Sequence, residues 1–248
     1  MTMKDIFSIG KKYTPISFVL SVTCVFVSCL TVWNHNIWEL LAYWSNPQYP
    51  WQYLTGAFVH GSLIYSESPV WFVWIHLFLN LLMILPLGIL LEKILGSAKL
   101  MELFVFSWLI CSVVYQILLW DQHIPASGIS AIGYSFWPGT VYVLLKIFKE
   151  NRNAFFHLPS NYFYITILSL MVIMLIPAIT GMVSFELHIS GVIVGLIFAL
   201  RNKKTIDLFF DKQTAYVPSK VNFVILIWLI PIGILLIVGL YLLEIIKI

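Results

Sequence analysis

The sequence predicts an all-α protein that crosses a membrane several times. Of its 248 residues, 60% are hydrophobic and only 10% are charged, whereas soluble domains carry about 25% charged residues. A surface with so few charges cannot face water over its whole extent, so lipid is the expected solvent. No basic stripe interleaved with aromatic residues is present, and this excludes a nucleic-acid-binding protein.

Seven apolar runs are each roughly long enough to cross a hydrocarbon core of about 30 Å at about 1.5 Å per residue. They cover approximately 15–33, 71–91, 99–120, 130–147, 161–179, 185–200 and 221–245. No small-residue cleavage site follows the first run, so we expect an uncleaved helix there. We expect one membrane domain over 1–248, with a cytoplasmic N-terminus (1–14), an outer interfacial loop (34–70), a six-helix core (about 15–200) and a seventh helix (221–245).

The basic residues fall in alternate loops between these runs. Of the 14 Lys and Arg residues, 13 lie on one face of the predicted topology, and only Lys247 lies on the other. The positive-inside rule then places the N-terminus in the cytoplasm and the C-terminus outside. The segment 34–70 lacks Lys and Arg and is rich in Trp and Tyr, which is typical of a segment in the headgroup zone.

Neither a metal nor a cofactor is expected. Cys24, Cys29 and Cys111 all lie in apolar runs, and no Cys or His occurs at a metal-ligand spacing. Buried cysteines commonly serve as small hydrophobic residues, and we assign them so.

Polar side chains inside membrane spans are costly and indicate function. Three of the runs carry such groups: His76 and Asn80, which share a helix face at i, i+4, Ser130, and His188. Counted from the nearest cytoplasmic charges, His76, Ser130 and His188 lie roughly 25, 24 and 20 Å into the membrane. These side chains are therefore expected in one plane near the outer surface.

This set of groups is suited to acyl transfer. A serine hydroxyl becomes nucleophilic when a neighbouring base such as neutral histidine takes its proton. No acidic residue lies near His188 except Glu186, which we expect to face another direction, so a Ser–His dyad is favoured over a triad. Asn80, His76 and the backbone N–H of Ser130 are candidate donors to an oxyanion.

The sequence resembles the rhomboid intramembrane proteases in the family's motif order over about residues 50–200. Four stretches carry the resemblance beside the serine motif Gly128-Ile-Ser130, which is similar to GxSG. They are Trp51-Gln-Tyr-Leu-Thr-Gly-Ala-Phe-Val-His60, His76-Leu-Phe-Leu-Asn80 (HxxxN), Gly88-Ile-Leu-Leu-Glu92-Lys-Ile-Leu-Gly96 (GxxxExxxG) and His188-Ile-Ser-Gly191-Val-Ile-Val-Gly195 (HxxGxxxG).

The resemblance implies roles for individual residues. Ser130 would be the nucleophile, His188 the general base and acid, Asn80 and His76 the oxyanion donors, and Tyr134 an aromatic that stacks on His188. The paired glycines of the last motif would allow close packing against the serine-bearing helix, and the seventh helix would give a "6+1" arrangement. Glu92 is expected to act as a turn and cap residue, and His60 as an anchor of the outer loop.

The sequence departs from the family pattern at two positions near these motifs. Ala131 stands where Gly is usual, and its methyl group could crowd the nucleophile. Gln52 stands where Arg is common, which alters any charge-assisted bond from that loop. The stretch from His60 to His76 is also longer than in the simplest members.

The expected function is an endopeptidase that hydrolyses peptide bonds in or near the transmembrane helices of other membrane proteins. We expect it in a bacterial plasma membrane, in contact with the lipid bilayer, with the site open to the outer side. One alternative is an inactive rhomboid-like protein that binds membrane clients, which only Ala131 favours. A seven-helix transporter or receptor is disfavoured, because paired intramembrane charges and a broken-helix repeat are not visible.

Overall fold

The computed structural model describes residues 14–60, 70–119, 125–150, 152–157, 159–179 and 185–212, and also 235–236, 239–240 and 242–243. The predicted seventh helix at 221–245 and the segment 1–13 lie wholly or mostly outside the described residues, as does most of the stretch between His60 and His76.

Six long helices coincide with the first six predicted runs, and the predicted all-α polytopic fold is confirmed. They are α2 (Pro15–Trp33), α5 (Val70–Leu95), α6 (Ser97–Leu119), α7 (Ser130–Glu150), α9 (Pro159–Ile179) and α10 (Phe185–Arg201). Within the described part of the chain, α2, α5 and α6 are long and apolar enough to cross a membrane, and α10 with the following helix, bent by 59°, counts as a fourth candidate. The count of seven spans stays a prediction.

Short elements connect these helices. The segment 34–70, which keeps its predicted name of outer loop, contains α3 (His35–Leu41), α4 (Gln52–Thr55) and the 3-10 helix η1 (Gly56–Phe58). Helices α8 (Arg152–His157) and α11 (Lys203–Lys212) follow α7 and α10. Two short antiparallel strands, β1 (Tyr43–Trp44) and β2 (Pro125–Ala126), join the outer loop to the segment before α7.

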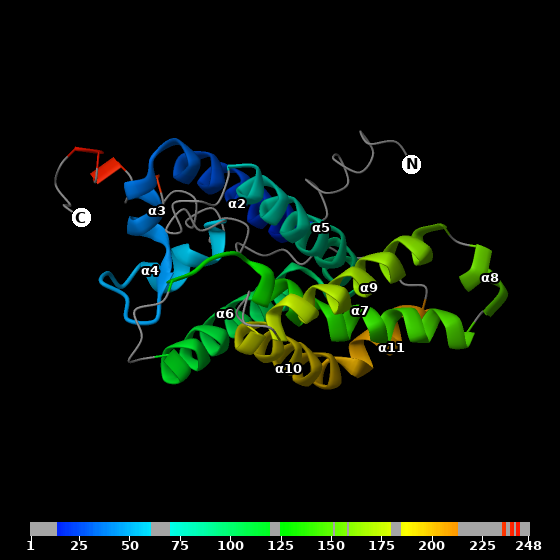
Figure 1. Ribbon diagram of the computed structural model, residues 1–248. Coiled ribbons are helices and arrows are strands. Elements are labelled where there is room, and N and C mark those ends of the chain that lie inside the picture. Colours follow the sequence, from blue (N-terminus) through cyan, green and yellow to red (C-terminus); the bar gives the residue numbers. More distant parts are fainter. Residues whose placement is uncertain are drawn as a thin grey trace.

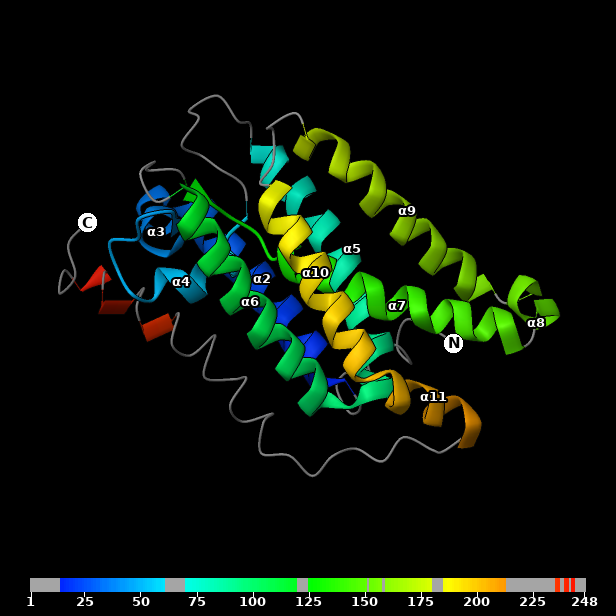
Figure 2. The same ribbon diagram turned by 90° about the horizontal axis from the view of Figure 1, so that it is seen from below.

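Helix α7 lies inside the bundle, between α5 and α10. Helix α10 packs along α7 and α6, while α2 packs along α5. Figure 1 shows α2 and α5 side by side at one side of the bundle, and Figure 2 shows α10 running between α6 and α9. The arrangement brings the amino-terminal ends of α7 and α10 together, and these ends carry Ser130 and His188.

Glu92, near the end of α5, caps the start of α2. Its Oε1 accepts bonds from the N–H of Ile16 (3.0 Å) and the hydroxyl of Ser97 (2.6 Å). Its Oε2 accepts from both the N–H (3.0 Å) and the hydroxyl (2.7 Å) of Ser17. The first N–H groups of a helix have no partner within the helix, so this buried carboxylate supplies one from another span. The predicted cap role of Glu92 therefore extends to α2, some 75 residues away.

Helices α7 and α10 approach to backbone contact at two glycines of α10. A Cβ placed on Gly191 would lie 2.0 Å from the carbonyl oxygen of Ala131, and one on Gly195 would lie 2.1 Å from that of Ser135. No side chain larger than hydrogen fits at either position without moving a helix. Small residues at helix interfaces permit this kind of close approach in membranes.

The outer loop is held by hydrogen bonds from buried side chains to its own backbone. Gln52 donates to the carbonyl of Glu39 (2.9 Å) and accepts from the N–H of Tyr49 (3.1 Å). Thr55 donates to the carbonyl of Leu41 (2.6 Å). The side chain of Gln52, which stands where the resemblance implies Arg, is thus satisfied by neutral hydrogen bonds.

Candidate active site

The segment before α7 has a backbone conformation that requires glycine. Gly128 has a φ of +102°, a region that other L-residues rarely adopt. Its N–H donates to the carbonyl of Gly56 in the outer loop (3.3 Å). After this turn the chain enters α7 directly at Ser130, so the serine occupies the first position of a helix that is buried in the bundle.

Ser130 and His188 form a direct hydrogen bond. The His188 Nε2 lies 2.9 Å from the Ser130 Oγ, although the two residues are 58 positions apart. For Nε2 to accept the hydroxyl proton, the imidazole must carry its own proton on Nδ1. This is the protonation state in which a histidine can act as a base toward a serine.

The ring of His188 is held by Tyr134, one turn after Ser130 on α7. The two rings are stacked, with centroids 4.4 Å apart and an interplanar angle of 30°. The Tyr134 hydroxyl donates to the carbonyl of Met171 on α9 (2.8 Å), and the Tyr134 side chain is 1% exposed. Helix α9 therefore fixes Tyr134, and Tyr134 in turn fixes the plane of the imidazole.

No carboxylate contacts His188 among the described residues. In the part of the chain that the structure describes, its Nδ1 is buried without a hydrogen-bond partner, and the side chain of Glu186 is exposed on the same helix. The pair is therefore a Ser–His dyad in its geometry. This arrangement agrees with the expectation from the sequence that Glu186 faces another direction.

His76 and Asn80 lie on the other side of the Gly128 turn, on α5. A Cβ placed on Gly128 would lie 3.0 Å from the His76 Nε2 and 3.4 Å from the Asn80 Nδ2. The Asn80 amide donates one bond to the carbonyl of His76 (3.0 Å) and has a second N–H. The structure thus brings both residues against the backbone of the segment that leads into Ser130.

A cavity of about 80 Å³ lies at the dyad, with room for a few water molecules. Ser130, His188 and His76 line it, together with Ala131 and residues of the outer loop and of α6. Ala131 lines the cavity beside Ser130, and the 2.9 Å bond between Ser130 and His188 forms with Ala in place at this position.

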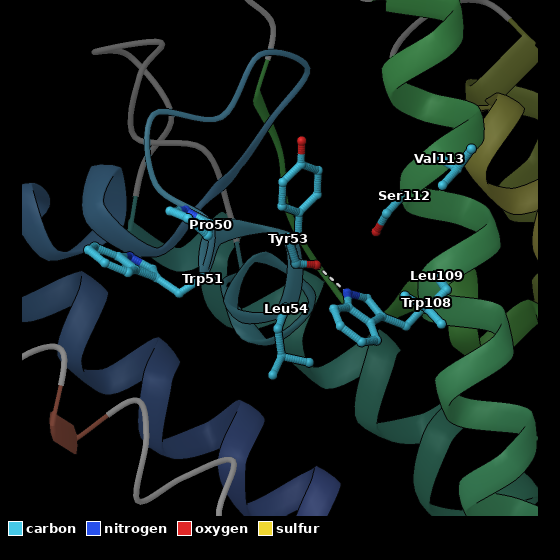
Figure 3. Close-up of a pocket in the computed structure, with 8 residues that line it drawn as sticks. All are labelled: Pro50, Trp51, Tyr53, Leu54, Trp108, Leu109, Ser112 and Val113. Atoms are coloured by element: carbon cyan, nitrogen blue, oxygen red, sulfur yellow. Dashed lines mark hydrogen bonds between the residues drawn. The ribbon is translucent and has the colours of Figure 1, made fainter.

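A larger, mainly apolar cavity of about 540 Å³ lies between α4 and α6 (Figure 3). Tyr53, Trp108 and Ser112 line both cavities. The Trp108 indole N–H donates to the Tyr53 carbonyl, as the dashed line in Figure 3 marks, and Gln116 donates to the Tyr53 hydroxyl (3.0 Å). These bonds form a wall that separates the larger cavity from the dyad.

The predicted site residues Ser130, His188, His76, Asn80 and Tyr134 all come together in the structure. The residues of the separating wall, Tyr53, Trp108 and Ser112, were not predicted from the sequence. Aromatic residues are common in interfacial loops and apolar spans, and the sequence around them does not indicate which cavity they line. Only the position of Tyr53 within the motif that runs from Trp51 to His60 could have drawn attention to it.

These features define a helical membrane protein with a serine–histidine pair in its core. A family model described as "Rhomboid domain" matches residues 47–204, more than half of the chain, and the chain therefore belongs to the rhomboid family. No curated protein matches the sequence. In the described residues, no group of three or more His, Cys, Asp or Glu side chains could hold a metal ion.

Proposed function

We propose that this protein is an intramembrane serine endopeptidase that cleaves membrane-protein substrates in or near their transmembrane helices. The observation that carries the proposal is the 2.9 Å bond between the Ser130 Oγ and the His188 Nε2. Membership of the rhomboid family supports the substrate class, because its members typically act as intramembrane serine proteases.

The reaction begins at Ser130. As its oxygen attacks the substrate carbonyl carbon, His188 Nε2 takes the hydroxyl proton and the carbonyl oxygen becomes an oxyanion. His188 then gives that proton to the leaving amine as the peptide bond breaks. Water from the cavity attacks the acyl-enzyme in the same manner and regenerates the serine. Tyr134 holds the imidazole plane during both proton transfers.

Three donors are proposed for the oxyanion. They are the free N–H of the Asn80 amide, the ring N–H of His76 and the backbone N–H of Ser130. All three belong to groups around the Gly128 turn, and the start of α7 adds a favourable helix dipole. Such donors, fixed before the reaction begins, supply much of the rate enhancement in acyl transfer.

The charge distribution supports the location and orientation. With 13 of 14 basic residues on one predicted face, the positive-inside rule favours an N-terminus in the cytoplasm and a dyad that opens to the outer side of the membrane. A bacterial plasma membrane is the proposed location.

The test is the cleavage of a model transmembrane substrate by purified protein in liposomes. We expect Ser130→Ala and His188→Ala to reduce turnover on the order of 10⁴-fold or more. Ser135→Ala is the matched control, because it removes a serine hydroxyl five residues further along α7 that donates to the carbonyl of Ile132. This variant should keep turnover. A fluorophosphonate probe should label Ser130 in wild type and leave the Ser130→Ala variant unlabelled.

Cleavage that persists in both dyad variants would refute the dyad. If the folded wild type neither cleaves several substrates nor reacts with the probe, the protein is a rhomboid-like client-binding protein without protease activity.

A further inference from the structure

His60 is a buried histidine next to the candidate site for which the proposed mechanism has no role. It ends the outer-loop stretch that precedes α5 and is 1% exposed. Its Nδ1 lies 3.0 Å from the carbonyl oxygen of Phe58 and 3.1 Å from the hydroxyl of Ser28 on α2. The ring thus links the outer loop to the first span.

These contacts fix the tautomer of His60. A carbonyl oxygen can only accept, so the Nδ1 that faces Phe58 must carry the proton. The Nε2 is then a lone-pair acceptor, and it is buried without a hydrogen-bond partner among the described residues. Burial, and to a lesser extent the nearby His76, holds the pKa of His60 well below its usual range, so the ring is neutral. A buried acceptor without a partner costs stability, and such groups in native structures call for an explanation.

The His60 ring lies against the His76 ring. Their centroids are 5.3 Å apart and their planes meet at 68°, an edge-to-face arrangement. On another side, His76 faces the backbone of Gly128, where a Cβ would come within 3.0 Å of its ring. The His76 imidazole is therefore confined between a histidine anchored to α2 and the turn that leads into Ser130.

We propose that His60 is a positioning residue that acts through His76, holding its imidazole beside the Gly128 turn so that its N–H points toward the developing oxyanion. The proposal rests on the proposed function above. The anchor depends on the Nδ1 N–H, whereas the contact with His76 depends on the aromatic ring as a whole, so different substitutions remove one and keep the other. The anchor contributes to stability, whereas the ring contact contributes to the rate.

Two substitutions separate these contributions. His60→Asn keeps a side-chain N–H where Nδ1 donates to Phe58 but removes the ring, so we expect near-native stability and a kcat lowered roughly three- to tenfold with little change in KM. His60→Phe keeps a ring against His76 but loses the anchor. We expect it to melt at a lower temperature and to retain kcat when folded.

The decisive measurement is a double-mutant cycle with His76→Ala, read as turnover and as the rate of Ser130 phosphonylation. If His60 acts through His76, adding His60→Asn to His76→Ala causes no further loss. The matched control is Thr55→Val, which removes a loop anchor to Leu41 away from His76. It should lower stability and leave the rate of folded protein unchanged in both backgrounds.

Equal losses from His60→Asn in the wild-type and His76→Ala backgrounds would overturn the proposal, as would an unchanged kcat in His60→Asn. If His60→Asn does not fold, the folded His60→Phe variant decides. A loss of its activity to the level of His76→Ala would also overturn the proposal, because the ring contact is kept in this variant. Failure of the proposed function is distinguishable, because the wild type would then be no more active than Ser130→Ala.

Discussion

Replacing Glu92 with glutamine tests whether one buried carboxylate holds the α2–α5 pair together. The change replaces one carboxylate oxygen with an NH₂ group, and the two hydrogen bonds which that oxygen accepts are lost. If Oε2 is replaced, the lost bonds are those from the N–H and the hydroxyl of Ser17. If Oε1 is replaced, they are those from Ile16 and Ser97. A hydrogen bond to a charged group contributes about 1.5–3 kcal/mol. A serine hydroxyl can turn to accept from the new NH₂, which recovers part of the loss. We therefore expect the free energy of unfolding to fall by about 3 kcal/mol.

The assay is equilibrium unfolding in mixed micelles with increasing SDS, followed by circular dichroism. The matched control is Glu102→Gln, which makes the same chemical change at the partly exposed pair with Lys99 (2.6 Å). Such pairs contribute about 0–1 kcal/mol. If the two variants unfold at the same SDS fraction, the hydrogen bonds of Glu92 do not hold α2 in place and the reasoning is wrong.

Three further outcomes follow from the packing around the site. Gly191→Val should separate α7 from α10 at the Ala131 carbonyl and abolish both probe labelling and cleavage, whereas Ile193→Val on the lipid-facing side should change neither. Gly128→Ala should lower kcat by at least about tenfold. An alanine is disfavoured at the positive φ of this position, and its methyl group would lie 3.0 Å from the His76 ring. A variant with native kinetics would contradict this. A hydrogen bond from the Tyr142 hydroxyl of α7 is the main cause that lowers the pKa of the Asp207 carboxylate. The contribution of this carboxylate to stability is therefore present above the ordinary Asp pKa and is lost as the pH falls through the lower pKa of the folded state. Melting curves between pH 6 and pH 3 should therefore show a smaller acid-induced decrease in Asp207→Asn than in wild type.

The helices could be predicted from the sequence because their causes are local. Each of the six long helices corresponds to a run of apolar residues that is visible in the sequence. The proximity of Ser130 and His188 was predicted from shared depth and motif order, since both lie at a similar distance from the basic residues that follow their spans. The 2.9 Å separation itself depends on how α7 packs against α10.

Features that depend on distant partners could not be predicted. Glu92 reads in sequence as an acidic residue beside Lys93 in a turn, and nothing local indicates that its partners are the first N–H groups of α2. In the same way, the orientation of Tyr53 between two cavities is set by bonds from α6. The two-residue strands carry no periodic signal, because two residues are too few to show alternation.

The contact of Gly191 and Gly195 with the backbone of α7 has a consequence for control of activity. Two helices in backbone contact cannot move closer or slide past each other freely, and the dyad spans the same interface at the amino-terminal ends of α7 and α10. Separating the backbone segments that carry Ser130 and His188 would require a displacement of one whole helix against the bundle. Under the proposed function, the catalytic pair is assembled at rest, and the entry of substrate and water, not the formation of the pair, decides when the protein acts.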